Sequence, residues 1–219
     1  AAAVSGDLGA VIVDADDPDM TGCAATDAAY GVGELLTITC TFDEAVTVTG
    51  TPTVTLSNGD VASYASGTTS ANIVFTTTIA QGDSTSADLA VSSIQPTAGG
   101  ATMKDAAGNA IDTTVTAGDL GTVTVDGAVP VFSSVAATDG AYGVGETLSI
   151  TVTWGEAVVV SGTPTLTLSN GDTASYASGT GTNSLVFTTV IAEADTASSD
   201  LSVSSFGGTI ADAAGGAAG

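Results

Sequence analysis

The chain has 219 residues, with one basic residue, 24 acidic residues and no histidine, which gives a formal net charge of −23. Nucleic acid and anionic membrane surfaces are excluded as partners, because both require clustered basic side chains. The absence of histidine rules out His-dependent catalytic triads and His-ligated metals. Hydrophobic residues make up 43% of the chain, which predicts a folded core. No run approaches 18 consecutive apolar residues, so we expect no insertion into a membrane.

Composition favours a secreted protein, extracellular or at the cell surface. The chain begins Ala1-Ala-Ala-Val4 without a methionine, a start left by cleavage of a signal peptide and equally by truncation. Thr, Ser, Gly and Ala are abundant, and lysine is nearly absent. Acidic surfaces of this kind stay soluble in salt, because screening reduces the repulsion between their charges.

An internal repeat is the strongest single feature of the sequence. Ala29-Tyr-Gly-Val-Gly-Glu34 recurs as Ala141-Tyr-Gly-Val-Gly-Glu146 at an offset of 112 residues. Of the 68 residues in 27–94, 45 are identical to their counterparts in 139–206. A unit of about 110 residues is the size of a small β-sandwich domain.

The first predicted element is a strand within residues 1–13. Residues 5–14 match residues 117–126 at the offset of 112, so this strand repeats the last strand of the first repeat. Leu8, Val11 and Val13 occupy the apolar positions that we expect to enter a core. The repeat body that this strand would complete does not lie before it in these 219 residues.

The densest acidic cluster, Asp14-Ala-Asp-Asp-Pro-Asp19, follows this strand. Carboxylates are preferred ligands of Ca²⁺, which takes about six to eight oxygen atoms. Asp14, Asp16, Asp17 and Asp19 are therefore candidate calcium ligands. The alternative is a solvated acidic turn in which Pro18 ends the strand.

The two cysteines are predicted to form a disulfide. Cys23 and Cys40 align with Val135 and Val152 in the second repeat, at positions expected to face the core on neighbouring strands. Secretion favours the disulfide. The alternative is a pair of buried free thiols.

Apolar and polar residues alternate with a period of two in each repeat, which indicates half-buried strands. One face carries Leu36, Ile38, Cys40 and Phe42 in the first repeat, and Leu148, Ile150, Val152 and Trp154 in the second. Trp154 belongs to this series, which favours core packing over a sugar-binding platform. Asn-Gly pairs at 58–59 and 170–171 predict hairpin turns. About seven strands per repeat and no helix indicate an antiparallel sandwich.

The repeat phase predicts three segments: a donor strand at 1–13, domain 1 at 14–126 and domain 2 at 127–219. Asp105-Ala-Ala-Gly108 matches Asp212-Ala-Ala-Gly215 at an offset of 107. Domain 1 continues from there into a final strand, and the 219 residues hold no counterpart of that strand in domain 2. We therefore expect two whole repeats in circularly permuted order.

Several segments resemble bacterial immunoglobulin-like repeats, the tandem modules of large surface adhesins and other extracellular repeat proteins. These segments are Val125–Pro130, Ala141–Trp154, Glu156–Val158 and Gly162–Leu168. The resemblance covers nearly the whole chain in two copies. It implies two tandem immunoglobulin-like antiparallel β-sandwiches, an extracellular location and calcium at domain junctions. The linker at 126–130 departs from the pattern, because Asp126 is its only acidic residue.

The leading function hypothesis is a structural subunit of an extracellular filament. The N-terminal strand of one copy would complete domain 2 of the next copy, by donor-strand complementation. Such a head-to-tail contact makes an open homopolymer unless a rotation closes a ring. Two alternatives stay open: a calcium-stiffened repeat fragment of a large cell-surface adhesin, and closure of the strand onto its own domain 2.

An enzyme is not expected. The aspartate pairs that resemble glycosidase carboxylates, such as Asp83 with Asp88, recur in both repeats, and two identical active sites in tandem would be unusual. The sequence indicates no cofactor other than calcium and no particular surface ligand.

Overall fold

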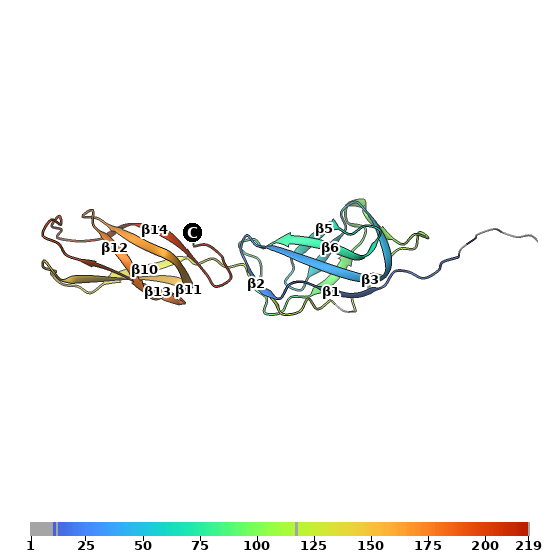
Figure 1. Cartoon of the computed structure of the whole chain (residues 1–219), viewed down its shortest axis with the longest axis horizontal. Coiled ribbons are helices and arrows are strands. Elements are labelled where there is room, and N and C mark those ends of the chain that lie inside the picture. Colours follow the sequence, from blue (N-terminus) through green and yellow to red (C-terminus); the bar gives the residue numbers. More distant parts are fainter. Residues whose placement is uncertain (1–10, 12, 117, 219) are drawn as a thin grey trace, which may run out of the picture. The chain divides into compact units, whose positions relative to one another are not determined.

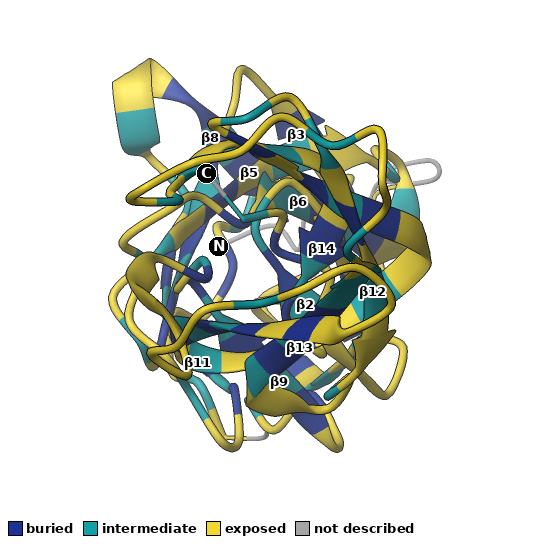
Figure 2. Cartoon of the chain, turned by 90° about the vertical axis from the view of Figure 1, so that its left-hand side faces the viewer, coloured by how far each residue is buried: buried dark blue, intermediate teal, exposed yellow. Residues whose placement is uncertain are grey.

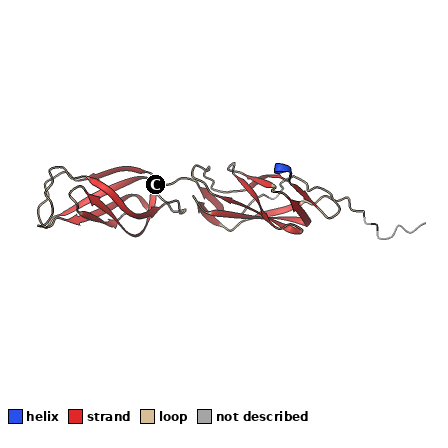
Figure 3. Ribbon diagram, turned by 90° about the horizontal axis from the view of Figure 1, so that it is seen from above, coloured by secondary structure: helices blue, strands red, loops and turns tan. Residues whose placement is uncertain are grey.

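The computed structural model describes residues 11, 13–116 and 118–218, and within them the protein is all-β with antiparallel sheets. The one helical element in the described part of the chain is a short 3₁₀ turn, η1 (Ala98–Gly100) (Figure 3). No helix in the described ranges has the length and apolar character needed to cross a membrane. Most of the predicted donor strand, including Leu8, lies outside the described residues.

The chain divides into two compact units. The first comprises Ala1–Ala28, Leu35–Thr77 and Ser86–Val123, and the second comprises Ala29–Glu34, Thr78–Thr85 and Thr124–Gly219. Each unit contains one large antiparallel sheet, formed by β1 and β3–β8 in the first and β10–β14 in the second (Figure 1). This arrangement is compatible with a β-sandwich in each.

The first unit is built on a seven-stranded sheet. Its strands, in spatial order, are β1 (Met20–Ala24), β3 (Leu35–Thr49), β6 (Ser70–Thr78), β5 (Val61–Ser66), β4 (Thr53–Leu56) and β7 (Val91–Gln95). The seventh, β8 (Thr102–Lys104), pairs with the end of β3. A separate two-stranded sheet joins β2 (Ala28–Gly31) to β9 (Val123–Asp126).

Burial along β3 alternates as the sequence predicts, since Leu36, Ile38, Cys40 and Phe42 are buried between more exposed neighbours. Figure 2 colours the ribbon by burial and shows buried and exposed residues together on the strands. The period-two pattern therefore identified the faces of this strand correctly.

The second unit is built on a five-stranded sheet. Its strands are β10 (Phe132–Ala137), β11 (Thr147–Leu168), β12 (Thr173–Ser178), β13 (Thr182–Val190) and β14 (Val203–Ala211). The 22-residue strand β11 covers the positions that β3 and β4 occupy in the first repeat. Its first half pairs with β10 and β13, and its second half pairs with β12 and β14.

The two Asn-Gly turns connect neighbouring strands, as predicted. One joins β4 to β5, and the other joins β11 to β12. Gly59 and Gly171 both have φ of +98°, in the left-handed region that favours glycine. The same backbone conformation therefore recurs in both repeats at these turns.

Cys23 and Cys40 form a disulfide, which confirms the predicted pairing. The two residues lie directly opposite each other on β1 and β3, with their Cα atoms 4.0 Å apart. In the second repeat, Val135 and Val152 are paired in the same register on β10 and β11. The first repeat thus carries a covalent link where the second has an apolar contact.

This substitution between the repeats suggests a matched test of the disulfide. The double variant Cys23→Val with Cys40→Val should keep the apolar contact and lose the crosslink, which closes a loop with a sequence separation of 17. We expect the free energy of unfolding of the first unit to fall by about 3 kcal/mol. Scanning calorimetry of the variant against oxidised and reduced wild-type protein measures this loss. A variant that unfolds at the same temperature as the oxidised protein would contradict it.

Candidate functional site

The last strand of the first repeat closes the core of that repeat. Leu120, Val123 and Val125 on this segment are 1%, 0% and 1% exposed. The backbone carbonyls of this segment accept hydrogen bonds from the chain segments on either side of it. The Leu89 N–H donates to the Val123 carbonyl (2.9 Å), and the Ala25 N–H donates to the Leu120 carbonyl (3.2 Å). The segment therefore supplies apolar side chains to the core and backbone partners to the strands beside it.

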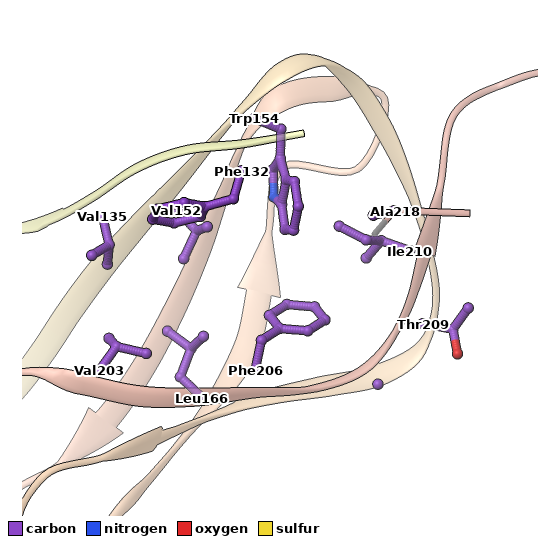
Figure 4. Close-up of a pocket in the computed structure, with 11 residues that line it drawn as sticks. Phe132, Val135, Val152, Trp154, Leu166, Val203, Phe206, Thr209, Ile210 and Ala218 are labelled. Carbon is purple, nitrogen blue, oxygen red and sulfur yellow. The ribbon is translucent and has the colours of Figure 1, made fainter. Parts of the chain in front are cut away.

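The second repeat has an open groove at the corresponding place. Two adjoining cavities of about 540 and 510 Å³ lie between β10 and β14, and Val135 and Val203 line both of them. At one end, Phe132, Trp154 and Phe206 face the same space (Figure 4). At the other end lie Leu148, Leu201 and Tyr142. We call these two cavities together the groove.

Side chains on the groove are more exposed than their counterparts in the first repeat. Met20 is 4% exposed, whereas Phe132, at the equivalent position, is 53% exposed. Leu89 is 0% exposed, whereas Leu201 is only partly buried. Leu89 is less exposed than Leu201 because the segment that ends in β9 covers it.

The described residues of the second repeat contain no counterpart of β9, and this explains a difference in secondary structure between the repeats. Residues 28–31 form β2 by pairing with β9. Their counterparts, residues 140–143, are not in a strand. A strand at this position requires a partner of the β9 type, since an isolated strand leaves its backbone groups unpaired.

Trp154 supplies a buried polar atom at the groove. Its indole packs edge to face against Phe132 and Phe206, with ring centroids 6.2 and 5.9 Å away. Its Nε1 is buried and has no hydrogen-bond partner among the described residues. A buried donor without an acceptor costs about 1–3 kcal/mol. Trp154 is thus a core residue, as predicted, and it also forms one wall of the groove.

The described residues of the predicted donor strand are exposed. Val11 is 62% exposed and Val13 is 87% exposed. Their counterparts at the offset of 112 are Val123 and Val125, which are buried. The same apolar positions therefore enter a core in one copy of the segment and face solvent in the other.

Two groups of three carboxylates could hold a cation. The first cluster is Asp14, Glu44 and Asp105, and the second cluster is Asp126, Glu156 and Asp212. In each cluster, one oxygen per residue lies within 4.8 Å of the others. The residues correspond between repeats, at offsets of 112, 112 and 107.

The structure brings only one of the predicted calcium ligands into a cluster. Asp14 joins the first cluster, and the clusters found among the described residues do not include Asp16, Asp17 or Asp19. Sequence reasoning missed Glu44 and Asp105, which lie far from Asp14 along the chain. The recurrence of both residues in the second repeat, as Glu156 and Asp212, is the signal that could have found them.

Hydrogen bonds from Asn109 hold the first cluster. Its side-chain amide donates to Asp105 Oδ2 (2.7 Å) and to the Asp16 carbonyl (3.0 Å). Burial alone would raise the pKa of Asp105, but hydrogen bonds from Asn109 and from backbone amides lower it. Reduced contact with solvent, followed by the charges of Asp105 and Asp14, raises the pKa of Glu44.

The second cluster has no such amide. Asp212 is 5% exposed, and its Oδ1 accepts the N–H groups of Ala214 (2.8 Å) and Gly216 (2.9 Å). Its Oδ2 is buried without a hydrogen-bond partner in the described part of the chain. Burial, followed by the charges of Asp126 and Asp212, raises the pKa of Glu156.

No protein-family model matches the chain, and no curated protein is significantly similar to it. The resemblance to immunoglobulin-like repeats therefore stays an expectation from the sequence.

Paired truncations measure how open the groove is. Leu89→Ala removes a side chain from a closed core and should cost about 2–5 kcal/mol of stability. Leu201→Ala removes the equivalent side chain from the groove wall and should cost clearly less in the unassembled protein. Urea unfolding followed by circular dichroism gives both values. Equal losses would mean that the groove is covered in the isolated chain.

Proposed function

We propose that this protein is a structural, non-enzymatic subunit of an extracellular filament. Residues 5–13 of one copy enter the groove in the second repeat of the next copy, head to tail. The observation that carries the proposal is the burial of Leu120, Val123 and Val125, since these are the counterparts of Leu8, Val11 and Val13. The chain thus contains a second copy of the sequence that closes its own first repeat.

The first repeat serves as a template for the contacts of the inserted strand. The amides of Leu89 and Val91 donate to the carbonyls of Val123 and Gly118. Applying the offset of 112, the Leu201 N–H would donate to the Val11 carbonyl. The Val203 N–H would donate to the Gly6 carbonyl in the same way.

Burial of apolar side chains drives the insertion. Each of Leu8, Val11 and Val13 contributes about 1.5–3 kcal/mol when it moves from water into the groove. The exposed aromatic face of Phe132 gains cover at the same time. Backbone pairing along the strand adds direction and register, because a shift of one residue would turn the apolar side chains outward.

The contact joins two different surfaces, so it repeats without limit unless a ring closes. An extracellular location fits the Cys23–Cys40 disulfide, which is compatible with an oxidising environment. Immunoglobulin-like modules of the kind that the sequence resembles would suit such a filament. Calcium is also part of the proposal, and the structure offers two candidate places for it: the first cluster, which includes Asp14 of the predicted ligands, and the second cluster.

The adhesin-fragment hypothesis is the second candidate, and the recurrence of a carboxylate cluster in each repeat favours it. In that case, residues that follow Gly219 in a longer chain would fill the groove. The two hypotheses differ in one measurable property. Strand donation between copies depends on protein concentration, whereas closure by the same chain does not.

Adjacent substitutions on opposite faces of the strand test the filament. Val11→Asp places a charge at a position whose counterpart, Val123, is buried, and it should abolish assembly. Ala10→Asp adds the same charge at a position whose counterpart, Thr122, is exposed, and it should still assemble. Negative-stain microscopy and sedimentation of full-length protein provide the measurement. The proposal fails if wild-type protein forms no filaments, or if Val11→Asp assembles as wild type does.

A peptide test reports on the groove directly. A synthetic peptide of residues 1–14, added to the Val11→Asp protein, should bind and shift the fluorescence of Trp154, the only tryptophan in the chain. The shift should be to shorter wavelength, because the peptide covers the groove wall. The same peptide carrying Val11→Asp is the control. An unchanged spectrum at saturating peptide would count against strand donation.

A further inference from the structure

The two carboxylate clusters differ at one position that decides whether the buried aspartate has a hydrogen-bond donor for its Oδ2 atom. In the first cluster, the Asn109 amide donates to Asp105 Oδ2 at 2.7 Å. The counterpart of Asn109 at the offset of 107 is Gly216, which has no side chain to donate. Asp212 Oδ2 is consequently buried and without a hydrogen-bond partner among the described residues.

This orphaned oxygen is unusual, because a buried carboxylate oxygen normally has a donor or a cation beside it. The surroundings of Asp212 are negative as well. Asp126 and Glu156 each place a carboxylate oxygen within 4.8 Å of the group. The chain has one basic residue, Lys104, and it belongs to the first repeat. The missing positive partner is therefore not a side chain of this repeat.

We propose that the second cluster, Asp126, Glu156 and Asp212, binds a calcium ion, and that Asn109 takes the place of that ion in the first cluster. The chain then holds one calcium site rather than one per repeat. This inference does not depend on filament assembly, since all three ligands belong to the second unit.

The available ligands are those of a hard cation. Three carboxylates surround the site, and histidine and cysteine are absent from it. The Ala128 carbonyl oxygen, which lies beside Gly216 together with Asp212 Oδ2, is a further oxygen ligand. A Cβ at Gly216 would press against Asp212 Oδ2 and lie 3.0 Å from the Ala128 carbonyl oxygen. Carboxylate and carbonyl oxygens in irregular geometry favour Ca²⁺ over Mg²⁺, which demands near-octahedral ligands and keeps its water.

The geometry of Asp212 fits a ligand role. Its Oδ1 is fixed by two backbone amides, from Ala214 and Gly216. These bonds hold the carboxylate plane in place and leave Oδ2 for the cation. Outer contacts of this kind orient the ligands in metal sites.

Calcium titration of the full-length protein by isothermal titration calorimetry tests the inference. Wild-type protein should bind about one Ca²⁺ per chain, in the range of about 10⁻⁴–10⁻³ M that is typical of extracellular modules. Asp212→Asn should weaken this binding by at least about 100-fold, since loss of even an outer-shell partner costs roughly 10–100-fold. Asp105→Asn, the same change in the first cluster, should leave it intact.

A stability measurement separates a ligand role from a merely structural one. The Asn side chain in Asp212→Asn can still accept the two backbone N–H groups and can donate to Glu156 or Asp126, as Asn109 does to Asp105. Without calcium, the melting temperature of this variant should therefore equal or exceed that of the wild type. Addition of calcium should raise the melting temperature of the wild type and not that of the variant.

The reverse substitution tests the role given to Asn109. Asn109→Gly removes the amide from Asp105 Oδ2 and should create a second calcium site. The inference is overturned if wild-type protein binds no calcium at millimolar concentration, if Asp212→Asn binds as wild type does, or if wild-type protein already binds two ions equally.

Discussion

A sheet core in this protein is closed by its last strand, and most other features follow from whether that strand is present. In the first repeat, Val123 fills the core while its carbonyl accepts the Leu89 N–H. In the second repeat, nearly the same sequence leaves Leu201 half-covered and Phe132 exposed. Side-chain burial and backbone pairing are thus completed together or not at all, because one segment supplies both.

Local patterns in the sequence predicted the strands and the disulfide, since these depend on neighbours that the repeat itself defines. The alternation along β3 and the Asn58-Gly59 turn are encoded within a few residues. The carboxylate clusters could not be predicted in this way. Asp14 meets Glu44 and Asp105 only because the strands bring three distant segments together. Nor did the alternation indicate that β11 would run without a break through the positions of β3 and β4.

The groove and the second cluster lie on the same piece of chain. Ile210 and Ala218 line the groove, and the Ala218 N–H donates to the Ile210 carbonyl (3.0 Å). Asp212 lies between them and holds the intervening loop through Gly216. A cation on Asp212 would therefore order the loop that forms one end of the groove. Binding at one place then stabilises the other, since both act on the same local folding equilibrium.

The differences between the repeats have one thing in common, which is that the first repeat has an internal bond where the second has none. The first repeat has a disulfide where the second has Val135 and Val152, and it has Asn109 where the second has Gly216. In both cases the first repeat supplies the stabilising bond from its own side chains, as the Cys23–Cys40 disulfide and as the hydrogen bond from Asn109. The second repeat instead retains an unpartnered Trp154 Nε1 and an unpartnered Asp212 Oδ2. Buried polar atoms of this kind are costly, so their presence in the same repeat as the groove supports the proposal that this repeat takes up a strand and a cation from outside itself.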